Sequence, residues 1–359
     1  MKFIISREIK NYLRNPLYWI GALIIMATVF LCLKDYLNIR WYSVDEILTK
    51  PDDVTEDDAD VYYGYIAADE TVSEEEKYER GLDHVREDFI QVFGMSEAEA
   101  DEAVNDIKSR HMSIAETLSY MEEEYSYYGG NVFEGGSNIK ATTEEVNQYM
   151  DSGLREHSYA YWFANKFADF TGVMISFFAA VMLAFLFTAD MKKETHELLH
   201  TKPITAGRYV MGKFLSGVTV LSFVVLIMMI TFSILCMRNE LSAGIPDVIC
   251  HMAKATVLYV MPTVIASTAV CVLVSILFRN PIPAIPIMFL YVIYSNLGSY
   301  DADGNYGFYG RILGLMFRFP DNFFETAPMP MFRLNRILLL LLSGVCILLA
   351  TVKWKKVRI

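Results

Sequence analysis

The sequence predicts an all-α integral membrane protein with six transmembrane helices and a mostly helical extracellular domain inserted between helices one and two. Two observations predict this class. Hydrophobic residues make up 53% of the 359 residues and charged residues only 21%, and the apolar residues gather in long uncharged runs. The acidic residues, in contrast, concentrate in one segment near the N-terminus.

Six uncharged runs approach or reach the length of about 20 helical residues that a bilayer core of about 30 Å requires. They are 15–33, 170–189, 214–237, 255–278, 280–300 and 337–352. The fifth run is the weakest, because Pro281, Pro283 and Pro286 crowd its start. Pro262, inside the fourth run, predicts a kinked helix, which membrane proteins tolerate where neighbours satisfy the freed backbone.

The first run is expected to be a retained signal-anchor helix, because no small-residue cleavage site follows it. Ahead of it, residues 3–14 place apolar side chains such as Ile5 and Ile9 on one helical face and basic ones such as Arg7 and Lys10 on the other. This pattern favours a short helix lying in the inner membrane interface. A plain extension of the first span is the alternative.

The charge of the chain is unevenly distributed. Residues 35–165 carry 9 Lys and Arg against 32 Asp and Glu, a net of −23, whereas the whole chain has a net charge of −12. We therefore expect three regions: residues 1–34 with the first span, an acidic extracellular domain over 35–165, and a five-helix membrane bundle over 166–359. The acidity favours solubility of the domain, and binding of a cationic ligand is the alternative.

Orientation follows from the short basic segments. They precede the first predicted span and follow the second, fourth and sixth, so that all four lie on one side of the membrane. The positive-inside rule makes that side the cytoplasm, with both termini inside and residues 35–165 outside. Four arginines of the last outer loop oppose this pattern: Arg311, Arg318, Arg333 and Arg336.

Helix signals recur in the acidic domain. Capping-box patterns occur at Thr71/Glu74, Ser96/Glu99 and Thr142/Glu145. A helical period of apolar residues follows the first box and ends at Gly94, and another follows the second box as far as Tyr125. Residues 308–317, in the last outer loop, are expected to form a short interfacial or re-entrant helix. The domain contains no cysteine, so no disulfide framework is expected, although a Cys236–Cys250 bridge between spans is an open alternative.

The stretch 195–214 contains two enzyme signatures. Gly207 to Lys213 fits G-x-x-x-x-G-K of a phosphate-binding loop, but Phe214 stands where the magnesium-binding Ser or Thr belongs and no strand precedes the glycine. Lys213 is better interpreted as a residue that extends along the inner end of the third span toward water. No nucleotide site is therefore expected.

His196, Glu197 and His200 fit H-E-x-x-H, which on a helix presents two zinc ligands and a general base. Catalysis also requires a third protein ligand. Every acidic or histidine candidate after His200 falls on the outer side of the predicted topology, roughly a membrane thickness away. No metal site is therefore expected.

The segment "KKETHELLHTKPITAGRYVMGKFLSG", residues 192–217, resembles the cytoplasmic loop of type-2 ABC exporter permeases. The positions that match the pattern of those loops are Thr195, Glu197, Leu198, Leu199, Pro203, Gly212 and Lys213. Glu194 stands where the family often has glycine. The resemblance implies that residues 190–213 form a coupling segment that contacts a cytoplasmic ATPase, with both enzyme signatures arising by chance.

The same resemblance implies a permease subunit of an ATP-driven exporter in a bacterial plasma membrane. No cofactor is expected in this chain, because ATP and magnesium would belong to a separate ATP-binding-cassette ATPase. A second permease, identical or different, and membrane lipid are the other expected partners, and nucleic acid is not. Two alternatives stay open: a membrane-embedded zinc metalloprotease using the HELLH motif, and a non-transporting membrane receptor.

Overall fold

The computed structural model describes residues 2–51, 54, 59–67, 74–128, 133, 138–184, 204–280, 282–300, 306–307, 310–319 and 322–357. Contacts between residues divide the chain into two compact units. One unit, called the bundle below, comprises Met1–Arg40, Ser152–Gly298 and Phe308–Ile359. The other, called the inserted unit, comprises Trp41–Asp151 and Ser299–Gly307.

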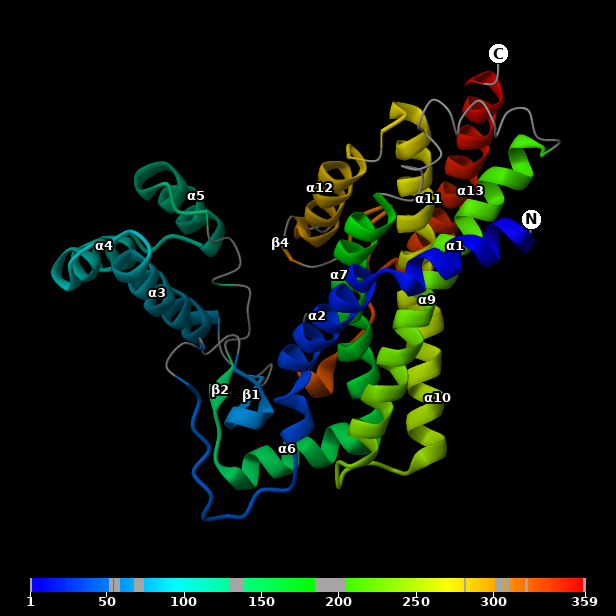
Figure 1. The fold of residues 1–359 in the computed structure, drawn as a ribbon. Coiled ribbons are helices and arrows are strands. Elements are labelled where there is room, and N and C mark those ends of the chain that lie inside the picture. The colour runs from blue at the N-terminus through cyan, green and yellow to red at the C-terminus, as the bar shows by residue number, and fades with distance from the viewer. Residues whose placement is uncertain are drawn as a thin grey trace. The chain divides into compact units, whose positions relative to one another are not determined.

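Long helices build the bundle (Figure 1). They are α1 (Lys2–Arg14), α2 (Pro16–Leu33), α7 (Tyr159–Ala184), α9 (Ala206–Met237), α10 (Ile245–Ala255), α11 (Met261–Phe278), α12 (Ala284–Asn296) and α13 (Phe332–Val357). Short 3-10 turns occur at η1 (Tyr36–Asn38) and η4 (Phe323–Glu325). Five stretches are long and apolar enough to cross a membrane: Pro16–Leu33, Tyr159–Ala184, Ala206–Met237, Ile245–Phe278 and Phe332–Lys356. The chain is thus a mostly helical protein with five candidate spans among its described residues.

The fifth predicted span corresponds to a shorter helix than expected. α12 has 13 residues, which extend about 20 Å at 1.5 Å per residue, less than a bilayer core of about 30 Å. The prolines explain the late start, because proline lacks an N–H and disfavours helical geometry in the residue before it. The count of six spans is therefore not confirmed by the described helices.

The fourth predicted span contains an irregular turn rather than a simple kink. Thr256–Val260 forms a π-helical segment between α10 and α11, and Pro262 lies in the first turn of α11. Proline removes one backbone donor, and a π turn is a common local adjustment inside a long helix. The Thr256 hydroxyl donates to the Met252 carbonyl at 2.7 Å, one turn earlier, and so satisfies a backbone acceptor beside this stretch.

The N-terminal helix is separate from the first span. Asn15 has an extended backbone, with φ −82° and ψ 118°, and its side chain accepts a hydrogen bond from the backbone N–H of Leu17. Pro16 then begins α2, a position where its missing N–H costs nothing. The structure therefore supports the short separate helix over a plain extension of the first span. The five cysteines are all free, so the Cys236–Cys250 bridge is absent.

The inserted unit consists of helices with two short two-stranded sheets. Its elements are η2 (Val61–Tyr63), β1 (Tyr65–Ile66), α3 (Glu74–Gln91), α4 (Glu97–Ser109), α5 (Ile114–Tyr125), β2 (Ile139–Lys140), α6 (Thr143–Glu156), β3 (Ser299–Tyr300) and β4 (Tyr306–Gly307). Strand β1 pairs antiparallel with β2, and β3 with β4. The core of α3, α4 and α5 contains Leu82, Val85, Phe89, Ile107 and Met121, each with 0% of its surface exposed.

The helix predicted to follow Ser96 is in fact two helices. α4 ends at Ser109, His111 takes a φ of 48°, and Ser113 begins α5 with a complete capping box to Glu116. The Ser113 backbone N–H and hydroxyl both donate to that carboxylate, which lowers the pKa of Glu116. Apolar periodicity alone does not show this break, because both helices place their apolar face on the same core.

Two of the three predicted capping boxes are formed. In each, the carboxylate accepts from the backbone N–H of the cap residue, at 2.8 Å for Ser96 and Glu99 and at 2.7 Å for Thr142 and Glu145. Thr71 lies outside the described residues. Gly94, expected to end α3, has a φ of 69° that favours glycine.

Candidate functional site

Only part of the predicted coupling segment is described. Glu194, Thr195, Glu197, Leu198, Leu199 and Pro203 all lie in 185–203, outside the described residues. Gly212 and Lys213 lie on α9, two turns after its start. The end of the bundle where α9 begins, called the coupling end below, is therefore where the structure bears on coupling.

Lys213 makes a buried ion pair with the N-terminal helix. Its Nζ lies 3.0 Å from Oε1 of Glu8 on α1, and the two side chains expose 3% and 14% of their surface. The expectation that Lys213 extends toward water is wrong, because α1 covers it. A buried ammonium requires a partner to offset its desolvation, and Glu8 provides one.

Gly212 permits the close approach of α1 to α9. A Cβ at this position would lie 3.2 Å from Cγ2 of Ile4, tighter than nearly all real Cβ contacts. Gly212 therefore lies where α1 packs closely on the start of α9. Any larger residue would push α1 outward and lengthen the pair between Glu8 and Lys213.

Two tyrosines tie the N-terminal region to the helices on either side of residues 185–203. The Tyr12 hydroxyl donates to the Met182 carbonyl on α7 at 3.2 Å. The Tyr18 hydroxyl donates to the Val220 carbonyl on α9 at 2.9 Å. α7 ends at Ala184 and α9 begins at Ala206. The N-terminal region therefore contacts both helices that flank the predicted coupling segment.

A hydrophobic cluster completes the coupling end. Its buried members come from α9, α11 and α13: Ala206, Tyr209, Val210, Ala269, Val272, Ile276, Cys346, Ile347, Ala350 and Trp354. Ile4 and Tyr12 of α1 pack against it. Tyr209 stacks on Trp354 with ring centroids 4.4 Å apart. The start of α9 and the C-terminal ends of α11 and α13 thus meet at one end of the bundle, where Figure 1 also places both termini of the chain.

A second polar site joins α7 to the segment between α12 and α13. Asp169, 2% exposed, accepts hydrogen bonds from the Arg318 guanidinium and, at 3.0 Å, from the backbone N–H of Phe319. Arg318 also donates to the side chain of Asn296 at the end of α12. We call residues 310–326 the outer loop, and this pair its anchor.

Two further α7 side chains hold the outer loop. Lys166, 4% exposed, donates to the Phe319 carbonyl at 3.0 Å and lies 5.6 Å from the ring of Tyr36. Asn165 lies one position earlier, and its amide is 3.4 Å from the Thr326 carbonyl. Ionisable side chains buried in a membrane bundle mark functional positions more often than chance.

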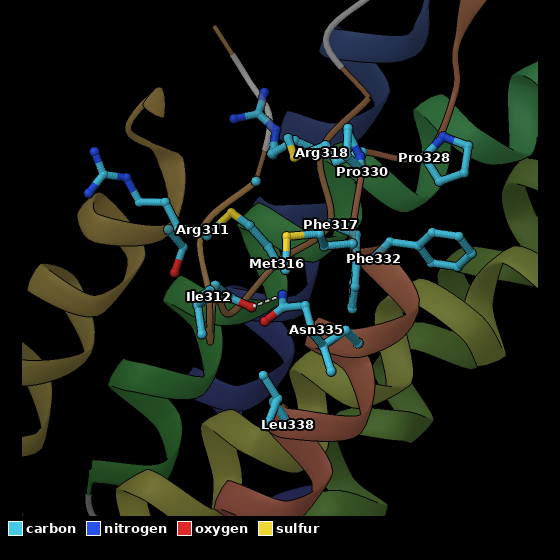
Figure 2. A pocket seen from close by; sticks show the side chains of 16 residues that line it. Arg311, Ile312, Met316, Phe317, Arg318, Pro328, Pro330, Phe332, Asn335 and Leu338 are labelled. Carbon is cyan, nitrogen blue, oxygen red and sulfur yellow. Dashed lines mark hydrogen bonds between the residues drawn. The ribbon is translucent and has the colours of Figure 1, made fainter. Parts of the chain in front are cut away.

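Residues 310–319 of the outer loop pack into the bundle without forming a helix. Leu315 donates from its N–H to Ser295 Oγ at 2.8 Å and accepts from Thr263 Oγ1 at 2.7 Å. Asn335 Nδ2 donates to the Gly314 carbonyl at 2.9 Å, as Figure 2 shows. The helix predicted over 308–317 is therefore absent from its described part, because side chains of α11, α12 and α13 take up the backbone groups.

A small cavity lies between the outer loop and the start of α13 (Figure 2). Its volume is about 30 Å³, and Met316, Phe317 and Asn335 are among the residues that line it. The buried Oδ1 of Asn335 has no hydrogen-bond partner among the described residues. The space suits one or two water molecules rather than a transported solute.

Sequence reasoning missed the partners at both sites. Glu8 stands among basic residues of α1, and this pattern indicates a solvated helix face. Asp169 and Lys166 directly precede the second uncharged run, where charges are expected at a membrane boundary. The sequence did contain one signal for each site: Glu8 is an isolated acid among basic residues, and Asp169 is an isolated acid beside an apolar run. A lone carboxylate needs a cationic partner once it is buried.

The structure tests one of the two enzyme signatures and not the other. Gly207 to Lys213 are helical within α9, so the glycine-rich turn that a phosphate-binding loop requires is absent. His196, Glu197 and His200 lie outside the described residues. Across the part of the chain that is described, no group of three or more His, Cys, Asp or Glu is placed to hold a metal ion.

We expect that zinc does not bind stoichiometrically to this chain. A double replacement, His196→Ala with His200→Ala, should leave the metal content of the purified protein unchanged, because a zinc site needs a third ligand. Elemental analysis checks this. One zinc per chain in the wild type that is lost in the double variant would restore the metalloprotease alternative.

These features define a multi-pass helical membrane protein. The chain belongs to the ABC-2 family of transporter proteins: the sequence profile described as "ABC-2 family transporter protein" matches residues 3–301. It is therefore a membrane component of an ABC transporter, as the resemblance of residues 192–217 implied. No curated protein and no solved structure gives a match.

Proposed function

We propose that this chain is the permease subunit of an ATP-driven exporter, coupled to a separate cytoplasmic ATP-binding-cassette ATPase. Residues 190–213 form the coupling segment, with Glu194, Thr195, Glu197, Leu198, Leu199 and Pro203 facing the ATPase. Residues 35–165 form the extracellular domain, and both termini are cytoplasmic. A second permease, identical or different, completes the pore in a bacterial plasma membrane.

The observation that carries the proposal, beside family membership, is the position of α1. It is bound to α9 through Glu8 and Lys213 and to α7 through Tyr12. Residues 185–203 connect these two helices in the sequence, so a push on that segment moves both of them and α1 together. Rigid-body movement of packed helices is a common form of conformational switching. The coupling end therefore has the connections needed to pass a movement of the segment to the spans.

The purified chain alone should not hydrolyse ATP. The residues that resemble a phosphate-binding loop are helical, and Phe214 replaces the hydroxyl that would hold magnesium. Phosphate release is measured for the chain alone and after addition of the ATPase that copurifies with it. Hydrolysis should appear only in the second case. Rapid hydrolysis by the lone chain that Lys213→Ala abolishes would contradict the proposal.

A further inference from the structure

Four arginines lie at the end of the bundle opposite the coupling end, where the positive-inside rule disfavours them. Arg311 donates from Nε and Nη2 to the Gly298 carbonyl, at 3.2 and 2.5 Å. Arg318 is paired with Asp169. In Figure 2 both guanidinium groups point away from the cavity. The protein thus provides hydrogen-bond acceptors for two of the four arginine side chains.

Arg333 and Arg336 are the other two. Among the residues that the structure describes, neither guanidinium has a carboxylate or carbonyl acceptor; each lies over the ring of Phe332, 5.6 and 6.0 Å from its centroid. α13 begins at Phe332, and the helix dipole disfavours cations in the first turns of a helix. The two charges therefore carry a cost that the described chain does not offset.

A tyrosine faces the same place. The ring of Tyr259 lies 6.0 Å from that of Phe332, and its side chain is within electrostatic range of both arginines. No acceptor for its hydroxyl is found in the described part of the chain. Tyr259 comes from the π-helical segment and the arginines from α13, so side chains of two elements gather around Phe332.

The surface next to this position is apolar. Leu334, Ile337 and Leu341 on α13 expose 46%, 55% and 61% of their surface, and Val257 beside Tyr259 exposes 61%. Exposed aliphatic side chains in a membrane helix face acyl chains. The arginine pair lies at the start of α13, directly beside this apolar face, and such a boundary is where basic side chains meet lipid phosphates.

We propose that Arg333, Arg336 and Tyr259 form a binding site for the headgroup of an anionic phospholipid. The guanidinium groups bind the phosphodiester, since their planar forks match phosphate oxygens, and the tyrosine hydroxyl donates to a further oxygen. The acyl chains lie along Ile337 and Leu341. Net negative charge is required, because a zwitterionic headgroup would bring its own cation beside the arginines. The inference rests on the membrane location of the chain and not on coupling to an ATPase.

The test is native mass spectrometry of the full chain in detergent, titrated with phosphatidylglycerol and with phosphatidylcholine. The wild type should bind the anionic lipid and discriminate against the zwitterionic one. Arg333→Gln with Arg336→Gln should weaken phosphatidylglycerol binding about tenfold or more, since each basic residue near a lipid surface contributes about a fivefold factor. Arg279→Gln is the matched control, because Arg279 is an exposed arginine at the coupling end.

Each outcome of this experiment either supports or overturns the lipid-binding site. Selective loss in the double variant, with a melting temperature in lipid-free detergent equal to that of the wild type, supports the site. Equal binding by the double variant and the wild type overturns it, as does an equal loss in Arg279→Gln. Competition by millimolar inorganic phosphate would assign the site to a soluble anion and overturn the lipid. None of these readings depends on an ATPase, so failure here leaves the transport proposal untouched.

Discussion

Replacing Lys213 with methionine is expected to release α1 from α9 and to uncouple the permease from its ATPase. The replacement keeps the length of the side chain and removes only its charge. Glu8, with 14% of its side chain exposed, is then left as a mostly buried carboxylate without a partner. Breaking a buried pair from one side costs about 3–5 kcal/mol, and the residual exposure of Glu8 places the cost near the lower end.

Hydrogen–deuterium exchange of residues 2–14 measures the release. A loss of about 3 kcal/mol in docking should raise the exchange of α1 amides by roughly a hundredfold. Lys10→Met is the matched control: Lys10 is an exposed lysine on the same helix, and its removal should leave exchange unchanged. Unchanged exchange in Lys213→Met would show that the ion pair does not hold α1.

The double variant Glu8→Leu with Lys213→Met separates docking from charge. Replacing a buried ion pair by apolar side chains is often neutral for stability. If α1 acts through its position, the double variant should recover both slow exchange and substrate-stimulated ATP hydrolysis in the assembled complex. If it recovers exchange alone, the charge pair itself takes part in coupling, and the positional role assigned to α1 is wrong.

The sequence predicted the helices more reliably than the contacts between them. Apolar runs located the five long spans, because a span must satisfy every backbone group within itself and so carries a local signal. The capping boxes at Ser96 and Thr142 were also local, spanning three residues each. Glu8 and Lys213, in contrast, are about two hundred residues apart, and no local pattern in either helix indicates the other.

Two predictions that the structure contradicts failed for the same reason. Residues 308–317 were predicted to be helical from their local composition, but the backbone groups of Gly314 and Leu315 bond to Asn335, Ser295 and Thr263, which belong to three different helices. Lys213 was predicted to reach water because the sequence does not show that α1 folds over it. In both cases a tertiary contact overrides a local preference, and only the folded chain reveals it.

Replacing Asp169 with alanine is expected to detach the outer loop from α7. The change removes the acceptor of both the Arg318 guanidinium and the Phe319 N–H, and Asp169 is 2% exposed, so little water replaces it. Loss of one side of a buried pair costs about 3–5 kcal/mol, and an unpaired backbone donor adds about 1–3 kcal/mol.

Thr326 reports on the detachment. It lies at the end of the outer loop and is 1% exposed, so a cysteine placed there in a background without the five native cysteines should react slowly with a maleimide. Asp169→Ala should accelerate the reaction at least tenfold by raising the population of the open loop. Asn165→Ala, which removes two long contacts of 3.4 Å to Thr326, is the graded control and should change the rate little.

The comparison of the two variants carries the argument, because both remove a polar side chain from the same face of α7. A general loosening of the bundle would expose Thr326 in both, and more in Asn165→Ala, since Asn165 contacts Thr326 directly whereas Asp169 binds the loop at Phe319. An anchor at Asp169 predicts the opposite order. Equal rates in Asp169→Ala and the wild type would instead mean that Lys166 and the loop's contacts to α11, α12 and α13 are enough to hold it.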